Sequence, residues 1–237
     1  VEQRMLAEFA QAGVEVVAME ASSIGLDQGR LEGTRIGTAV FTNLSRDHLD
    51  YHQTEEAYFE AKRRLFDWPG LRTAIVNGDD PIAARILDAL PENVQTVAFG
   101  QLPGEHGWRA RRKLSAYQIV EERDGAQVSV GGDWGRAQIR LRLIGQFNVV
   151  NAMAVAAVWI SLGVAFDVAM QRLEGLRPLP GRMEQVDVHR VVEEEGEARR
   201  EVAPHRHRAQ ALVQEHDERR VRARGPHPCV LEPHIAT

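Results

Sequence analysis

The chain has 237 residues, of which 43% are hydrophobic and 27% charged, and its formal net charge is −5 at pH 7. This length fits one large domain or one and a half, and the apolar fraction is sufficient for a hydrophobic core. The mild negative charge excludes a nucleic-acid surface built on bulk charge, so we expect no nucleic-acid partner. The single cysteine, Cys229, excludes an internal disulfide framework and a cysteine-based zinc site.

The sequence contains no recognisable targeting or membrane-spanning segment. Its first residues carry charge, and no long apolar run follows them. No stretch approaches the ~18 apolar residues of a membrane span. We therefore expect a soluble cytoplasmic protein with no membrane partner. The chain begins with Val1, inside a segment patterned like a helix, and this start predicts a fragment of a longer protein.

The first hundred residues alternate between short apolar runs and helix-patterned segments. The clearest helix covers Glu55–Phe66, with Thr54 as its cap, and a second is predicted to start at Pro81. Alternating strands and helices predict an α/β fold, a mostly parallel sheet flanked by helices. The apolar runs predict buried strands at Val14–Ala18, Thr38–Phe41, Ala74–Val76 and Val94–Phe99.

From Leu114 to Leu143 the pattern changes to β-hairpins. The runs Tyr117–Glu121 and Ala126–Val130 flank an Asp124-Gly125 turn, which is a strong hairpin signal. We therefore expect a small β-hairpin subdomain after the parallel sheet. Two helices are predicted after these hairpins, at Val149–Leu162, which is apolar nearly all round, and at Phe166–Leu173.

Beyond Asp187 the character of the sequence breaks. Six of the nine histidines lie in this last part, among many Arg and Glu residues. The run His205–Arg208 has the composition of a metal or nucleic-acid tail, but basic runs of this kind are usually solvated or disordered. The abrupt change favours a third interpretation, out-of-frame translation. We expect an irregular tail over residues 188–237, either frameshifted or disordered.

Polar clusters follow two of the predicted strands. Thr42–His52 packs acidic, imidazole and amide groups directly after Thr38–Phe41, and Glu20–Ser23 follows the first apolar run. Open α/β sheets bind ligands at the carboxyl ends of their strands. Hard oxygen ligands and a neutral imidazole suit a metal that is bound to phosphate. Turns also favour Asn, Asp and Ser for local reasons, so each cluster alone has a purely structural interpretation.

Individual residues in these patterns are ambiguous. Glu20 and His48 each have a simpler structural interpretation. They indicate a functional site only if they face one another across a phosphate. By pattern alone, Lys62 belongs to a solvated cationic helix face. Asn148 and Asn151 lie three residues apart, so both reach one face of a helix start, either as caps or as paired amides that read a purine edge.

Seven segments carry a resemblance to a known family. The chain resembles the Mur ligases, and within them the branch that adds the third residue of the peptidoglycan stem peptide. The resemblance covers Val1 to Asp187, and Asn43–His52 is the segment most specific to that branch. The matching segments, in family order, are Met19–Ser23, Gln28–Arg30, Thr42–His52, Glu60–Lys62, Asn77–Pro81, Gly145–Asn151 and Pro180–Glu184.

The resemblance implies an ATP-dependent amide ligase. ATP phosphorylates the terminal carboxylate of UDP-N-acetylmuramoyl-dipeptide to an acyl phosphate, and the amine of diaminopimelate or lysine attacks it. ATP and Mg²⁺ are the implied cofactors, because Mg²⁺ bridges phosphate oxygens and neutralises developing charge. The family precedent also implies a monomer.

The resemblance assigns a role to each candidate residue. The implied metal ligands, also expected to be catalytic, are Glu20, His48 and a carbamylated Lys62. The contacts to the UDP-muramoyl dipeptide are expected from Ser22, Gln28 and Arg30. The nucleotide contacts are expected from Asn148 and Asn151 at the adenine, and from Arg182 at a domain junction.

The chain also departs from the family. The family's phosphate loop, Gly-x-x-Gly-Lys-[Ser/Thr], is missing from the sequence, and Ile24 and Gly29 stand where histidines are frequent. We expect residues 1–181 to be the central ATP-binding domain without its phosphate-loop part, and residues 182–187 to begin a C-terminal domain. We expect the chain to be inactive by itself. Two alternatives stay open: a ligase like folylpolyglutamate synthase, or a non-catalytic Mur-ligase-like binding protein.

Overall fold

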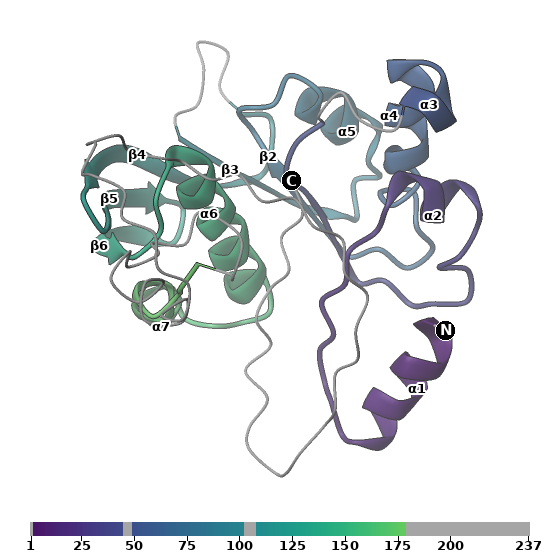
Figure 1. Cartoon of the computed structure of the whole chain (residues 1–237), viewed down its shortest axis with the longest axis horizontal. Helices are drawn as coiled ribbons and strands as arrows, with labels where there is room; N and C mark the ends of the chain where they lie inside the picture. The colour runs from purple at the N-terminus through teal and green to yellow at the C-terminus, as the bar shows by residue number, and fades with distance from the viewer. Residues whose placement is uncertain (1, 45–48, 102–107, 179–237) are drawn as a thin grey trace, which may run out of the picture.

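The computed structural model describes residues 2–44, 49–101 and 108–178. They form one six-stranded sheet in the order β1-β2-β3-β4-β5-β6, with helices packed against it (Figure 1). The first four strands run parallel, and β5 and β6 are antiparallel to their neighbours. This arrangement confirms the predicted α/β class. The strands are β1 (Thr38–Phe41), β2 (Thr73–Asn77), β3 (Gln95–Gly100), β4 (Arg112–Glu122), β5 (Gly125–Gly132) and β6 (Gly135–Leu141).

The parallel strands are apolar because helices cover both of their faces. On one face, Val76 and Ala98 pack with Phe59 of α4 (Glu55–Arg63) and with α5 (Ala83–Ala89). On the other face, Ile75 and Phe99 pack with α6 (Gln146–Ser161). Side chains that alternate along each strand therefore enter two separate apolar clusters.

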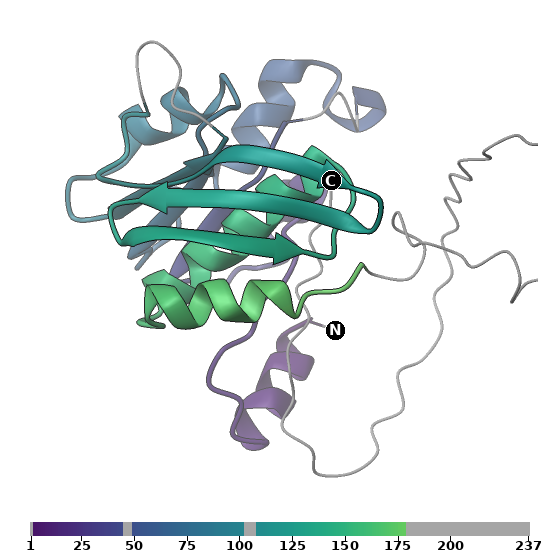
Figure 2. The same ribbon diagram turned by 90° about the vertical axis from the view of Figure 1, so that its left-hand side faces the viewer.

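The predicted hairpins form, and they continue the parallel sheet. Residues 112–115 at the start of β4 pair with β3, while β4 pairs with β5 up to Glu122. A two-residue turn that contains Asp124 then leads into β5. The three strands β4, β5 and β6, called the meander below, are covered on one face by α6 and bordered by α7 (Phe166–Glu174), as Figure 2 shows. The predicted apolar character of α6 is confirmed, since nine of its residues are buried.

One predicted strand is wrong. Residues 14–22 follow α1 (Glu2–Gln11) as extended chain without sheet pairing, and α2 (Ser23–Asp27) comes next. Val16 is 47% exposed and Met19 is 39% exposed. An apolar run becomes a buried strand only where a neighbouring strand pairs with its backbone groups and a covering layer buries its side chains. Within the described residues, β1 pairs only with β2, and the run at 14–18 has no such partner.

Smaller differences concern helix boundaries. α4 ends at Arg63 and continues only as turns, and α5 begins at Ala83 rather than at Pro81. The predictions for residues 179–237, including the domain start at 182–187, lie outside the described residues. No helix in the described ranges is both long and apolar enough to cross a lipid bilayer.

Candidate functional site

Side chains at the end of β2 hold the chain that leaves β1. Asn77 Nδ2 donates to the carbonyl oxygen of Thr42 at 2.8 Å. Asp80 Oδ2 accepts from the backbone N–H of Leu44 at 2.9 Å. The start of the Thr42–His52 segment is therefore fixed at the carboxyl edge of the parallel strands, where α/β sheets bind ligands.

The same edge includes the end of β3 and the start of α6. Asp79 Oδ2 accepts from the backbone N–H of Gln101 at 2.6 Å. Burial raises the pKa of the Asp79 carboxyl, although the Gln101 N–H and the Trp108 side chain favour its charged form. Gln101 Nε2 donates to Gln146 Oε1 at 3.3 Å, which brings the first residue of α6 to this edge.

The segment that enters α2 forms a small hollow. Ser22 has extended backbone angles, and its Oγ accepts from Gly25 N at 3.0 Å, so Ser22 is a true helix cap. Glu20, Ser22 and Arg30 are all exposed and line one hollow of about 30 Å³, together with Ala21, Gly25 and Leu31. The structure thus brings together three residues that the sequence assigned to metal or substrate.

Gln28 lies apart from this hollow. Its Nε2 is 3.4 Å from the hydroxyl of Tyr51 in α3 (Leu49–His52), which is a long hydrogen bond. The Tyr51 hydroxyl in turn donates to Asp27 Oδ2 at 3.0 Å. In this conformation Gln28 connects α2 to α3.

Lys62 is not on an open cationic face. Its side chain is half-buried, and Nζ lies 5.3 Å from the centroid of the Tyr58 ring. The neighbouring Arg63 is held by Glu60 at 2.9 Å and by Asp67 at 2.6 Å. The position of Lys62 therefore does not fit the interpretation as part of a solvated cationic helix face.

The two asparagines of α6 are partly buried in its first two turns. Asn148 Nδ2 donates to the carbonyl oxygen of Ile144 at 2.7 Å, so its amide nitrogen helps to shape the helix start. Gly145, with φ 89°, makes the turn into the helix. The cap interpretation is wrong for Asn148, because Gly145 is the N-cap residue and no side chain caps the helix; Asn151 lies one turn further along the same face.

His48 and Arg182 lie outside the described residues. Within the described ranges, no three His, Cys, Asp or Glu side chains gather closely enough to hold a metal ion. The Glu20 carboxylate and the Ser22 hydroxyl are hard oxygen donors, and a Mg²⁺ ion commonly takes one or two carboxylates plus phosphate oxygens and waters. These donors fit Mg²⁺, whereas Lys62 fits only after carbamylation, because an ammonium group has no lone pair.

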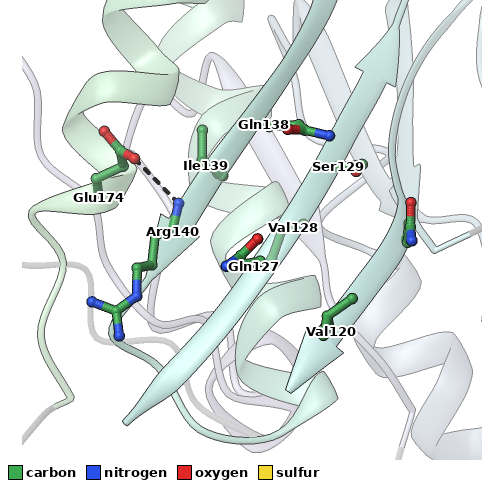
Figure 3. Close-up of a pocket in the computed structure, with 9 residues that line it drawn as sticks. Val120, Gln127, Val128, Ser129, Gln138, Ile139, Arg140 and Glu174 are labelled. Carbon is green, nitrogen blue, oxygen red and sulfur yellow. Dashed lines mark hydrogen bonds between the residues drawn. The ribbon is translucent and has the colours of Figure 1, made fainter. Parts of the chain in front are cut away.

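A larger hollow lies on the uncovered face of the meander (Figure 3). It has a volume of about 280 Å³ and is open to solvent. Sequence reasoning missed it, because outward polar residues on alternating strands are typical of a solvated face. Arg140 is already paired with Glu122 at 2.9 Å and with Asp124 at 2.8 Å. The hollow is lined by Gln118, Val120, Gln127, Val128, Ser129, Gln138, Ile139, Arg140 and Glu174.

Known proteins resemble this chain in sequence. A UDP-N-acetylmuramoyl-L-alanyl-D-glutamate–2,6-diaminopimelate ligase of Ralstonia nicotianae is 45% identical over 184 residues, which are 77% of this chain and 36% of that protein. A protein of the same name from Alkalilimnicola ehrlichii is 44% identical over 182 residues, again 77% of this chain and 36% of the relative. The chain thus spans little more than a third of the relatives that it matches.

Solved structures agree with the sequence comparison. A UDP-N-acetylmuramoyl-L-alanyl-D-glutamate–2,6-diaminopimelate ligase superposes with a TM-score of 0.69 at 32% identity, covering 78% of this chain and 37% of that one. MurF from Acinetobacter baumannii shares the fold, with a TM-score of 0.53 at 24% identity over 64% of this chain and 31% of its own. The model of the Mur ligase middle domain matches residues 2–159. The predicted resemblance is confirmed, and the chain belongs to the Mur ligase middle-domain family.

Proposed function

We propose that this chain is part of a peptide ligase of peptidoglycan precursor synthesis, of the UDP-N-acetylmuramoyl-tripeptide synthetase type. The enzyme joins UDP-N-acetylmuramoyl-L-Ala-D-Glu to an amino acid through an acyl phosphate made with ATP. We favour diaminopimelate over lysine, because the similar proteins are named for diaminopimelate. The observation that carries the proposal is the match of residues 2–159 to the Mur ligase middle domain, and the geometry adds a small hollow shared by Glu20, Ser22 and Arg30.

This hollow has the groups that an anionic substrate needs. The Arg30 guanidinium can bind a carboxylate or a phosphate with two parallel hydrogen bonds. The Ser22 hydroxyl adds a neutral hydrogen bond, while Gln28, which lies outside the hollow beside Tyr51, would contact a more distant part of the substrate. We assign all three residues to the UDP-muramoyl dipeptide.

Glu20 is our proposed ligand for one Mg²⁺, with His48 and a carbamylated Lys62 for a second. When bound, Mg²⁺ neutralises charge on the phosphate oxygens during phosphoryl transfer. The half-buried place of Lys62 beside Tyr58 favours a specific role over a solvated one. These three residues are our proposed catalytic group.

The adenine site is proposed at the start of α6, where Asn148 and Asn151 share a face. Support comes from Gln101, which brings that helix start to the carboxyl edge of the sheet. Arg182 is proposed near the nucleotide, where residues 182–187 begin a further domain after the central domain of residues 1–181. We place the reaction in the cytoplasm, carried out by a monomer, with 188–237 as a non-homologous tail.

By itself, the 237-residue chain is expected not to turn over. Its sequence contains no Gly-x-x-Gly-Lys-[Ser/Thr] segment to bind the β- and γ-phosphates with backbone N–H groups. The alternative proposal is a non-catalytic relative that binds the dipeptide. Continuous phosphate release from ATP, Mg²⁺, the dipeptide and diaminopimelate, beyond one equivalent per chain, would contradict the expected inactivity.

Calorimetric titration with UDP-N-acetylmuramoyl-L-Ala-D-Glu tests the proposed substrate site. We expect one dipeptide per chain and at least tenfold weaker binding in Arg30→Ala. The matched control is Arg136→Ala, which removes an exposed arginine from the meander. Equal affinity in both variants, or no binding by the unaltered chain, would refute the assignment of the hollow.

A further inference from the structure

A buried hydrogen bond joins α2 to α3. His52 Nε2 and Ser23 Oγ are 2.9 Å apart, although the two residues are 29 positions apart in the sequence. Ser23 is 1% exposed and His52 is 8% exposed. Losing one partner of a buried pair leaves the other polar group without a hydrogen bond, which costs more than the bond itself contributes.

The imidazole of His52 also touches the aromatic ring that contacts Lys62. The centroids of the His52 and Tyr58 rings are 5.5 Å apart, and Lys62 Nζ is 5.3 Å from the Tyr58 centroid. A continuous series of contacts therefore runs from Lys62 through Tyr58 and His52 to Ser23. Its last member, Ser23, directly follows Ser22 at the start of α2.

α2 packs its buried apolar side chain outside the two main clusters of the core. Its buried residue Leu26, and Leu31 just beyond it, belong to neither of the two apolar clusters of the described core. The other polar contacts are exposed: Asp27 accepts from Tyr51 and pairs with Arg64 at 3.1 Å. Exposed pairs of this kind contribute little to stability. The buried Ser23–His52 bond is thus the strongest polar link between α2 and the helices beside it.

The pair is not arranged for nucleophilic catalysis. A serine and a histidine at hydrogen-bond distance form a reactive pair only where a substrate can reach the hydroxyl. Ser23 Oγ is enclosed, since the residue is 99% buried. The bond therefore acts on the position of the helix rather than on a substrate.

We propose that His52 and Ser23 are positioning residues, whose hydrogen bond fixes the substrate-binding segment Ser22–Arg30 against α3 and the neighbouring α4, which carries Lys62. The pair couples the proposed dipeptide contacts to the proposed metal ligand. This inference rests on the proposed function. Neither residue touches the hollow formed by Glu20, Ser22 and Arg30.

Amide hydrogen exchange on the full chain tests the link without any ligand. In the present structure, the N–H groups of Gly25, Gln28 and Arg30 are hydrogen-bonded within the segment. We expect these three to exchange at least tenfold faster in Ser23→Ala and in His52→Ala. The double variant should exchange no faster than either single one, because both remove the same bond. His52→Gln, with an amide near the place of Nε2, should recover most of the protection.

The matched control is Thr96→Val, which removes a buried hydroxyl that accepts from Arg111 N at 2.9 Å in another part of the fold. It should lower the melting temperature without speeding exchange at Gly25, Gln28 or Arg30. Unchanged exchange of these amides in Ser23→Ala, a substitution that keeps the backbone and adds no bulk, would overturn the proposal. Equal losses of amide protection in His52→Gln and His52→Ala would also overturn the proposal.

Dipeptide titration then separates this inference from the proposed function. If the variants lose amide protection but the unaltered chain does not bind the dipeptide, the structural link stands and the proposed function is refuted. If the chain binds, Ser23→Ala and His52→Ala should each weaken affinity by about tenfold, and Thr96→Val should not. Affinities equal to that of the unaltered chain would contradict the coupling, even if stability falls.

Discussion

Asp80 and Leu44 are joined by a hydrogen bond between a carboxylate and a backbone N–H across 36 residues of chain. The second carboxylate oxygen of Asp80 accepts from Ile82 N, also at 2.9 Å. One side chain thus holds both the segment after β1 and the start of α5. Because the two bonds use different oxygens, an amide cannot replace the carboxylate without turning a donor toward an N–H group.

Asp80→Asn is expected to destabilise the chain by about 1–3 kcal/mol, since one partly buried N–H loses its acceptor. Urea denaturation measures the change. Asp88→Asn is the matched control, because Asp88 only pairs with Arg109 on the surface and its loss should cost less than about 1 kcal/mol. Equal effects of the two substitutions would show that the contact to Leu44 contributes nothing specific.

The difference in stability between the unaltered chain and Asp79→Asn should depend on pH in a defined direction. Burial raises the pKa of Asp79 in the folded chain above its ordinary value of 3.8. The folded state therefore binds this proton more tightly than the unfolded state, and the resulting stability is lost as the pH rises through the raised pKa. The unaltered chain should thus lose stability relative to Asp79→Asn as the pH rises from the ordinary value of 3.8 through the raised pKa.

Thermal unfolding across that pH range measures the difference. The neutral amide still offers an oxygen to Gln101 N. Glu121→Gln, at an exposed position of β4, corrects for the general effect of removing a negative charge. A difference that grows in favour of the unaltered chain as the pH rises would contradict the direction.

Two substitutions in α6 test its orientation in the core. Met153 is fully buried, and Met153→Ala should cost about 2–5 kcal/mol because it leaves a cavity. Phe147 is 85% exposed, and Phe147→Ala should change stability by no more than about 0.5 kcal/mol. Chemical denaturation of both variants measures these losses of stability. A larger loss for Phe147→Ala would place the wrong face of α6 against the sheet.

Local patterns predicted most of the fold. The buried strands around Ile75 and Phe99, the Asp124-Gly125 turn and the apolar helix α6 each follow from residues within one segment. The strand expected at 14–18 failed for a non-local reason. Its valines have strand character, but a strand is buried only where a partner strand lies beside it, and the described residues supply none.

The candidate site also has features that one segment predicts and features that depend on residues far apart in the sequence. Ser22 and Arg30 are close in sequence, so their shared hollow could be anticipated from one segment. The Ser23–His52 bond could not, because the two residues are 29 positions apart and β1 lies between them. Asp80 was recognisable only within the family-matching segment Asn77–Pro81, and its contact with Leu44 depends on how β1 and β2 pair.

Carbamylation of Lys62 can be tested cleanly because the chain has only two lysines, Lys62 and Lys113. With ¹³C-labelled bicarbonate, we expect a carbamate carbon signal that disappears in Lys62→Ala and persists in Lys113→Ala. Carbamates form from a neutral amine, so raising the pH should strengthen the signal. A signal that survives Lys62→Ala would assign the modification to another amine.

The most direct measurement for the account is a map of amide chemical-shift changes on adding UDP-N-acetylmuramoyl-L-Ala-D-Glu to the ¹⁵N-labelled chain. It compares the two hollows in one experiment. We expect the largest changes on Glu20, Ser22 and Arg30. Changes centred on Gln127 and Gln138 of the meander, or no changes at saturating dipeptide, would contradict it.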